Sequence, residues 1–145
     1  MWEWERSGWT LLELTLVVAI LILLFTIAYA RYQALVESAR VASVKASVDA
    51  MREGIRIFYA DQMLDGQGRF PTLVELSNVG GSVIIATGQV PENAFDVDGD
   101  PSNVVDATGV SRGTVVDASG GWAYRPETGE IWANTDTNEI HENVF

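Results

Sequence analysis

Two groups of carboxylates in this sequence have surroundings or spacing that could serve a chemical role. Glu13 is the one charged residue in the 22 residues from Trp9 to Ala30. Further along, Asp96, Asp98 and Asp100 alternate with other residues in a short acidic segment. The chain has no cysteine and one histidine, His141, which excludes disulfides, thiolate catalysis and zinc–cysteine sites. Because no pair of carboxylates can be singled out for acid–base work either, the sequence predicts a protein that is not an enzyme.

Glu13 needs a compensating partner if the segment around it lies in a membrane. A carboxylate within a membrane helix costs about 2.5–3.5 kcal/mol on insertion scales. One interpretation is local: Glu13 lies at the interface, where a helix N-terminus and the headgroups accept an anion. The other is that Glu13 has a functional role, in which a partner group compensates its charge.

The acidic segment leaves two interpretations open, a solvated acidic turn and a calcium site, and no cofactor other than Ca²⁺ is suggested. Closely spaced Asp residues in a turn supply several of the six to eight oxygens that Ca²⁺ takes. Asp96, Asp98 and Asp100 match the first, third and fifth positions of an EF-hand, but Pro101 and Ala107 occupy the positions of its Gly and its Glu. An EF-hand is thus excluded, and the alternative to another kind of calcium site, with Asp106 added, is a solvated acidic turn.

An apolar run and the amphipathic pattern that follows it together predict one long helix that would position Glu13. The apolar run that ends at Ala30 would form ~33 Å of helix, enough to cross the ~30 Å hydrocarbon core. Beyond Arg31 an apolar stripe recurs at helical spacing from Val41 to Phe58, without proline, until Asp65-Gly66 stops the pattern. We expect a helix from Trp9 to Leu64, with a membrane half at 9–30 and an amphipathic half that covers the protein's own C-terminal domain.

The remainder of the chain predicts a small sheet. Thr72 and Glu75 form a capping-box pattern that opens a short helix. Four segments rich in β-branched or aromatic residues are expected as strands: Val83–Ala86, Thr114–Asp117, Gly121–Arg125 and Glu130–Asn134. Pro126 and Gly129 favour a tight turn between the last two. The predicted fold class is α+β, a long N-terminal helix packed on a small antiparallel sheet.

Charge is distributed unevenly. Residues 31–64 hold five basic and four acidic side chains, whereas residues 65–145 hold three basic and thirteen acidic ones, a net charge of −10. This acidity argues against a nucleic-acid partner, which would need a basic surface.

The segment Gly8 to Leu14, Gly-Trp-Thr-Leu-Leu-Glu-Leu, followed by the apolar run, resembles the processing site of type IV prepilins and type II secretion pseudopilins. The family pattern is a short polar leader ending in Gly, then an aromatic residue, Thr, two apolar residues, Glu and a long apolar helix. The segment from Gly120 to Ile131 also resembles a hairpin found in many of these proteins. The leader departs from the family in carrying one Arg and two Glu, where several basic residues are usual.

The resemblance implies a structural subunit of a pilus or pseudopilus filament. A prepilin peptidase would remove the leader 1–8 by cutting between Gly8 and Trp9, and would commonly N-methylate Trp9. In the family, the Glu at the position of Glu13 attracts the N-terminal amine of the next subunit during assembly. The partners implied are the peptidase, further copies of the chain, other pilin-like subunits and an inner-membrane assembly platform. The implied location is a single pass through the inner membrane, with residues 31–145 as a periplasmic or extracellular domain.

A second function from a different class stays open. The alternative is a membrane-anchored exported domain that never polymerises, with a calcium-dependent binding module as one form of it. Gly8 and Glu13 distinguish the two functions, because a simple anchor needs neither residue.

Overall fold

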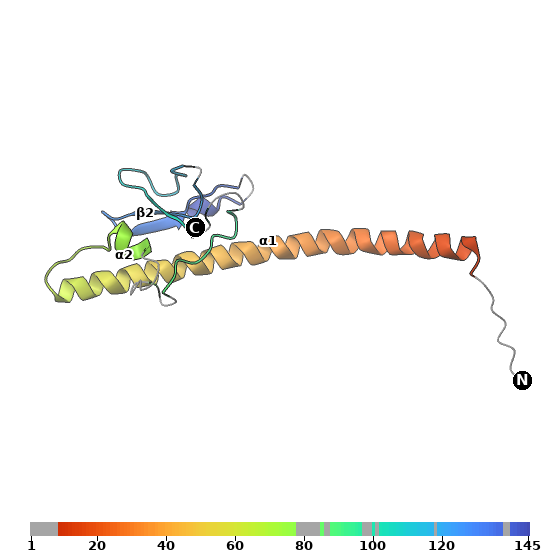
Figure 1. Cartoon of the computed structure of the whole chain (residues 1–145), viewed down its shortest axis with the longest axis horizontal. Helices are drawn as coiled ribbons and strands as arrows, with labels where there is room; N and C mark the ends of the chain where they lie inside the picture. Colours follow the sequence, from red (N-terminus) through yellow and green to blue (C-terminus); the bar gives the residue numbers. More distant parts are fainter. Residues whose placement is uncertain are drawn as a thin grey trace, which may run out of the picture. The chain divides into compact units, whose positions relative to one another are not determined.

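The computed structural model describes residues 9–77, 85, 88–96, 100, 102–117, 119–137 and 140–145. The elements in chain order are α1 (Leu11–Leu64), α2 (Leu73–Ser77), β1 (Val104–Asp106), β2 (Trp122–Arg125), β3 (Glu130–Ala133) and the 3-10 helix η1 (Glu142–Val144). The chain divides after Ser38 into two compact units. Helix α1, the long helix labelled in Figure 1, contributes residues to both units. The predicted α+β class, one long N-terminal helix and a small C-terminal sheet, is confirmed.

Helix α1 matches the predicted helix to within two residues at its start and ends at the same residue, Leu64. It ends where Gly66 takes a positive φ of 76°, a conformation that glycine adopts without steric cost. The last carbonyl groups of the helix are then satisfied by the following turn, in which the amides of Gln67 and Gly68 both donate to the Gln62 carbonyl oxygen. The Asp65-Gly66 stop signal in the sequence is therefore a true C-terminal cap.

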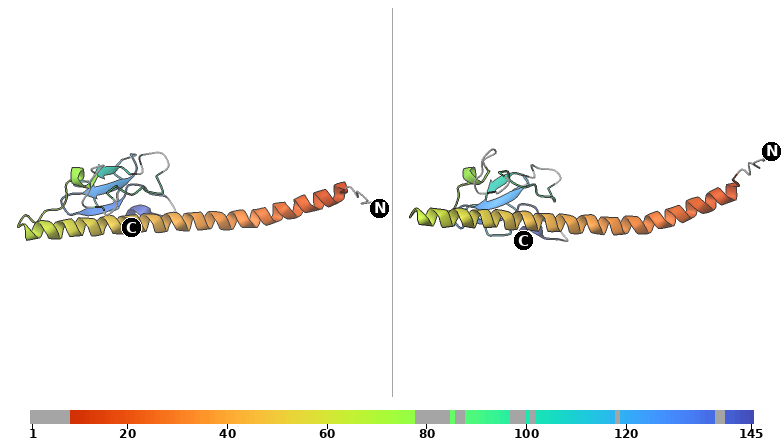
Figure 2. Two further views of the ribbon diagram at one scale, coloured as in Figure 1. Left: turned by 60° about the horizontal axis from the view of Figure 1, so that its bottom comes forward. Right: turned by 90° about the horizontal axis from the view of Figure 1, so that it is seen from below.

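The core of the second unit lies between the C-terminal half of α1 and the sheet. Figure 2 shows the strands lying over this half of the helix in both views. The predicted apolar stripe supplies the helix side of the core, where four residues are almost fully buried: Val44, Val48, Met51 and Ile55. The sheet side supplies Trp122, Tyr124 and Ile131, all without exposed surface. Each such side chain stabilises the fold by roughly 1.5–3 kcal/mol, so this contact is what holds the second unit together.

The sheet has the order β1-β2-β3 and is mixed. The predicted hairpin is confirmed, since β2 pairs antiparallel with β3 in a register that sets Trp122 opposite Ala133. The prediction of a purely antiparallel sheet is wrong, because β1 pairs parallel to β2. This pairing depends on Gly121, where a Cβ atom would lie 2.2 Å from the Asn103 carbonyl oxygen. The missing side chain lets the two backbones approach, and the Trp122 amide donates to that oxygen at 2.8 Å.

The other two predicted strands are not seen as strands in the described residues. Thr114–Asp117 lies within the described residues and is not a strand. Side chains of the sheet bind its backbone instead: Trp132 Nε1 donates to the Thr114 carbonyl oxygen, and Asn134 Oδ1 accepts from the Val116 amide. The prediction of this strand is therefore wrong. Of Val83–Ala86 the structure describes only Ile85, which is buried in the core, so the rest of that prediction lies outside the described residues.

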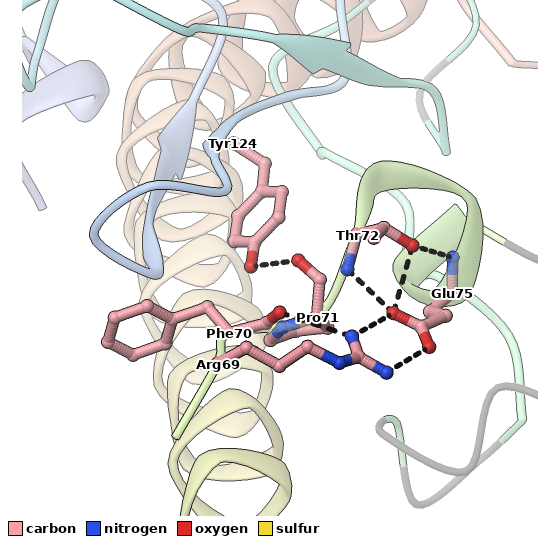
Figure 3. Close-up of polar contacts among 6 residues, drawn as sticks. All are labelled: Arg69, Phe70, Pro71, Thr72, Glu75 and Tyr124. Atoms are coloured by element: carbon pink, nitrogen blue, oxygen red, sulfur yellow. Dashed lines mark hydrogen bonds and ion pairs between the residues drawn. The ribbon is translucent and has the colours of Figure 1, made fainter. Parts of the chain in front are cut away.

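The connection from α1 to α2 is anchored to the sheet by polar contacts (Figure 3). Tyr124 on β2 donates its hydroxyl proton to the Pro71 carbonyl oxygen at 2.8 Å. The predicted capping box is confirmed, since Glu75 Oε2 accepts from the Thr72 amide and the Glu75 amide donates to Thr72 Oγ1. Arg69 adds a two-pronged ion pair to the Glu75 carboxylate, with distances of 2.8 and 2.9 Å.

Candidate functional site

The predicted processing site lies at the beginning of α1. Trp9 and Thr10 precede the first helical residue, and the Trp9 side chain is 75% exposed. Gly8, the residue before the predicted cut, lies outside the described residues. The described side of the predicted cut is thus accessible and non-helical, as a protease substrate must be.

Glu13 is held by Thr10 in a capping box at the N-terminus of α1. Glu13 Oε2 accepts a hydrogen bond from the Thr10 amide and another from Thr10 Oγ1, both at 2.9 Å. In return the Glu13 amide donates to Thr10 Oγ1 at 3.2 Å, and the Leu14 amide donates to the Thr10 carbonyl oxygen. The box satisfies amide groups that a helix start otherwise leaves without partners. Thr10-Leu-Leu-Glu13 has the same capping-box pattern, Thr-x-x-Glu, as Thr72 to Glu75. A capping box was predicted only at Thr72 and Glu75.

The capping box uses one of the two oxygen atoms of the Glu13 carboxylate. Both hydrogen bonds that the Glu13 carboxylate accepts go to Oε2, and no Lys, Arg or His among the described residues lies within ion-pair distance of Glu13. The helix N-terminus thus accepts the Glu13 anion, as the local interpretation expects, whereas its position at a membrane interface stays a prediction. The hydrogen bonds among the described residues leave the Oε1 atom unused.

The apolar segment of α1 that follows Glu13 is exposed along its length in the described structure. Its large residues are well exposed, among them Leu23 (66%), Phe25 (68%) and Ile27 (66%). By length and composition α1 is the helix among the described residues that could cross a membrane. A water-soluble protein rarely exposes a contiguous apolar surface of this size.

The predicted calcium residues are only partly described. Asp96 Oδ2 accepts from the Gly121 amide at 3.0 Å, and the Asp100 amide donates to the Ser119 carbonyl oxygen. Both ends of the acidic segment thus lie against the same stretch of chain before β2. Asp98 lies outside the described residues, and among those described no group of three His, Cys, Asp or Glu could hold a metal ion. The calcium prediction stays a prediction.

Other residues singled out in the sequence have structural roles. Trp122 and Trp132 are fully buried in the sheet, and their indole N–H groups donate to the carbonyl oxygens of Pro91 and Thr114. They are core residues of the sheet. His141 is on the surface, where its Nδ1 lies 2.9 Å from Asp136 Oδ1.

A pocket of about 390 Å³ in the second unit was not predicted. Three arginines line it, Arg52 and Arg56 from α1 and Arg112 from the loop between β1 and β2. The spacing of Arg52 and Arg56 places them on one helix face, which the sequence does show. Their meeting with Arg112, which is 56 residues further along, depends on the tertiary fold.

Comparisons of the chain with protein-family models, with curated proteins and with solved structures find no match. The resemblance carried by Gly8 to Leu14 therefore stays an expectation from the sequence.

Proposed function

We propose that the chain is a structural subunit of a type IV pilus-like or type II secretion pseudopilus filament, assembled through α1 after removal of the leader 1–8. The observation that carries the proposal is the Glu13 carboxylate at the head of an uncovered apolar helix, with Oε2 bound by Thr10 and Oε1 left for a donor. Cleavage before Trp9 would create an ammonium group on the residue that precedes Thr10. The site would then present an anion and a cation at the same end of the helix.

Electrostatics in a low-dielectric environment supports pairing between chains. Two unit charges 4 Å apart attract by about 4 kcal/mol at an effective dielectric constant of 20, against about 1 kcal/mol in water. Pairing the Trp9 ammonium of one chain with Glu13 of its neighbour would offset the cost of burying both charges. Because the two groups are separated along the helix, each pairing fixes the axial offset between neighbouring subunits. Glu13 would act as a registration group and would have no catalytic role.

The uncovered apolar segment supports the remaining parts of the proposal. Before assembly it would lie in the inner membrane as a single span, and in the filament it would pack against the same segment of other copies. The prepilin peptidase, the assembly platform and other pilin-like subunits are the partners that this route requires. Residues 31–145 would form the exported domain on the outside.

The capping box favours a second candidate, an anchored exported domain that does not polymerise. In that function Thr10 alone would account for Glu13, since a capping carboxylate needs no second chain. The two functions differ in what happens when Glu13 is removed.

The test compares Glu13→Ala with Glu37→Ala in a host that carries a prepilin peptidase and an assembly platform. Glu37 is an exposed carboxylate on the same helix, beyond the apolar run. We expect both variants to accumulate in the membrane fraction, and we expect only Glu13→Ala to lose filaments counted by electron microscopy. Filaments of normal number and length from Glu13→Ala would contradict the registration role and would favour the anchored domain.

A further inference from the structure

The pocket of about 390 Å³ lies wholly in the second unit, away from the apolar segment of α1. It is lined by residues of α1 and β3, by Phe70, by the turn between β2 and β3, and by Arg112. Its volume falls within the range of small-molecule sites. The filament proposal makes no use of it.

Positive charge gathers in this pocket although the second unit as a whole is acidic. Arg52 donates from Nη2 to the Ile131 carbonyl oxygen at 3.1 Å, and both Arg52 and Arg112 donate to a main-chain oxygen of Phe145, the last residue of the sequence. In the chain as described this oxygen belongs to a carboxylate, so two of the three guanidinium groups already hold one carboxylate oxygen at the pocket. These contacts use one nitrogen of each guanidinium, and a guanidinium has five N–H groups. Burial, and then the charge of Arg112, lower the pKa of Arg52. Three cations thus converge with most of their N–H groups unused by the contacts described.

Apart from the Phe145 oxygen, the acidic side chains around the pocket compensate this charge poorly. Asp49 lies 3.8 Å from Arg52 and Glu53 lies 3.8 Å from Arg56, both beyond hydrogen-bond distance, and both carboxylates are mostly exposed. Glu130 lines the pocket but is ion-paired with Arg125. An anion that entered the pocket would therefore meet guanidinium groups that still have donors to offer.

One wall of the pocket is apolar and aromatic. The rings of Tyr59 and Phe70 stack with centroids 4.5 Å apart, and Ile55 and Ile131 are buried beside them. Phe70 is held against Gly129, where a Cβ atom would lie 2.3 Å from its ring. The aromatic wall is thus fixed in place by the turn of the hairpin.

We propose that this pocket binds the carboxylate or phosphate group of a ligand whose remaining part is apolar or aromatic. Arginine recognises both groups through paired N–H donors, and the stacked rings offer a surface for the apolar part. The group could belong to a free small molecule or to a second copy of the chain, whose residues 65–145 carry a net charge of −10. Either source presents the same oxyanion to the same three arginines.

The experiment is calorimetric titration of the full-length chain, in a non-ionic detergent at fixed ionic strength, with inorganic phosphate and with phenyl phosphate. We expect saturable binding of both and tighter binding of phenyl phosphate, because only that probe reaches the aromatic wall. Arg56→Gln combined with Arg112→Gln should weaken binding at least tenfold, since a hydrogen bond to a charged group contributes about 1.5–3 kcal/mol. Arg40→Gln, on an exposed position of α1 outside the pocket, is the matched control and should bind as the native chain does.

Arg56→Gln alone keeps the test valid if the double variant does not fold. The Arg56 side chain is 75% exposed, and its nearest carboxylate oxygen, on Glu53, is 3.8 Å away and beyond hydrogen-bond distance, so its replacement should cost the fold little. It should still weaken phenyl phosphate binding, whereas Arg40→Gln should not. No saturable binding of either probe, or equal affinities in Arg56→Gln and Arg40→Gln, would overturn the proposal. Sedimentation of the same samples identifies the source: dissociation of oligomers by phenyl phosphate indicates an acidic group of a second copy, and an unchanged oligomeric state during saturation indicates a free small molecule.

Discussion

Replacement of Glu75 by Gln is a direct test of how the second unit holds the connection between α1 and α2. The Glu75 carboxylate accepts two hydrogen bonds from Arg69 and caps α2 through Thr72 (Figure 3). The Arg69 side chain and then the Thr72 amide lower the pKa of Glu75 from its ordinary value of 4.5 to about 2. Gln keeps the shape of the side chain but removes its charge.

The size of the effect follows from this lowering of the pKa. A decrease from 4.5 to about 2 corresponds to roughly 3 kcal/mol if it is fully expressed in the free energy of unfolding. The Glu75 side chain is 37% exposed, so screening by solvent reduces this contribution to about 1 kcal/mol. Because the pKa is lowered in the folded state, the stabilisation is complete above pH 4.5 and is lost as the pH falls through about 2.

The assay is urea unfolding of the full chain in a non-ionic detergent, followed by the near-ultraviolet circular dichroism of the buried tryptophans. At a pH near neutrality, Glu75→Gln should lower the free energy of unfolding by about 1 kcal/mol relative to the native chain. The difference should shrink as the pH falls toward about 2, because the native carboxyl group is then protonated as well. Glu127→Gln, an exposed position on the turn between β2 and β3, is the control and should change little. A difference that persists unchanged at low pH would refute the electrostatic reasoning.

Three further predictions concern the sheet, the acidic segment and the division of the chain. Gly121→Ala should lower the free energy of unfolding by at least about 2 kcal/mol, measured by urea unfolding, because the new Cβ atom would meet the Asn103 carbonyl oxygen; native-like stability would contradict the close approach of β1 and β2. Millimolar Ca²⁺ should raise the melting temperature on the order of 10 °C if it is present at ~100 times the dissociation constant. Asp98→Asn combined with Asp100→Asn should abolish this shift, and superimposable melting curves with Ca²⁺ and with chelator would favour the solvated turn. A chain that starts at Arg31 should be a soluble monomer with helix and strand signals in circular dichroism, and aggregation would contradict an autonomous second unit.

The sequence predicted those elements whose signals are local. The stripe from Val41 to Phe58 and the stop at Gly66 define the amphipathic half of α1, and Pro126 with Gly129 defines the hairpin. β1 was missed because Val104–Asp106 has only three residues and its parallel pairing depends on the distant Gly121. Thr114–Asp117 has the composition of a strand, but side-chain hydrogen bonds from Trp132 and Asn134 occupy its backbone instead of a ladder partner.

Of the two candidate sites, local sequence signals predicted one, and the other depends on the tertiary fold. Glu13 was visible as the lone charge of an apolar run, and its hydrogen bonds with Thr10 follow from a spacing that the sequence also shows. The arginine pocket was not visible, because Arg112 reaches Arg52 only through the tertiary fold, and a charge count of the acidic C-terminal region conceals it.

The mass of the mature N-terminus tests the central claim most directly. The protein is expressed in a host with an active prepilin peptidase, recovered from the membrane and from any filaments, and measured by intact-mass and peptide mass spectrometry. The filament proposal predicts a chain that begins at Trp9 and carries an N-methyl group, and it predicts that Gly8→Ala slows or blocks this processing. A chain in assembled filaments that retains residues 1–8, or processing that is unchanged in Gly8→Ala, would contradict it.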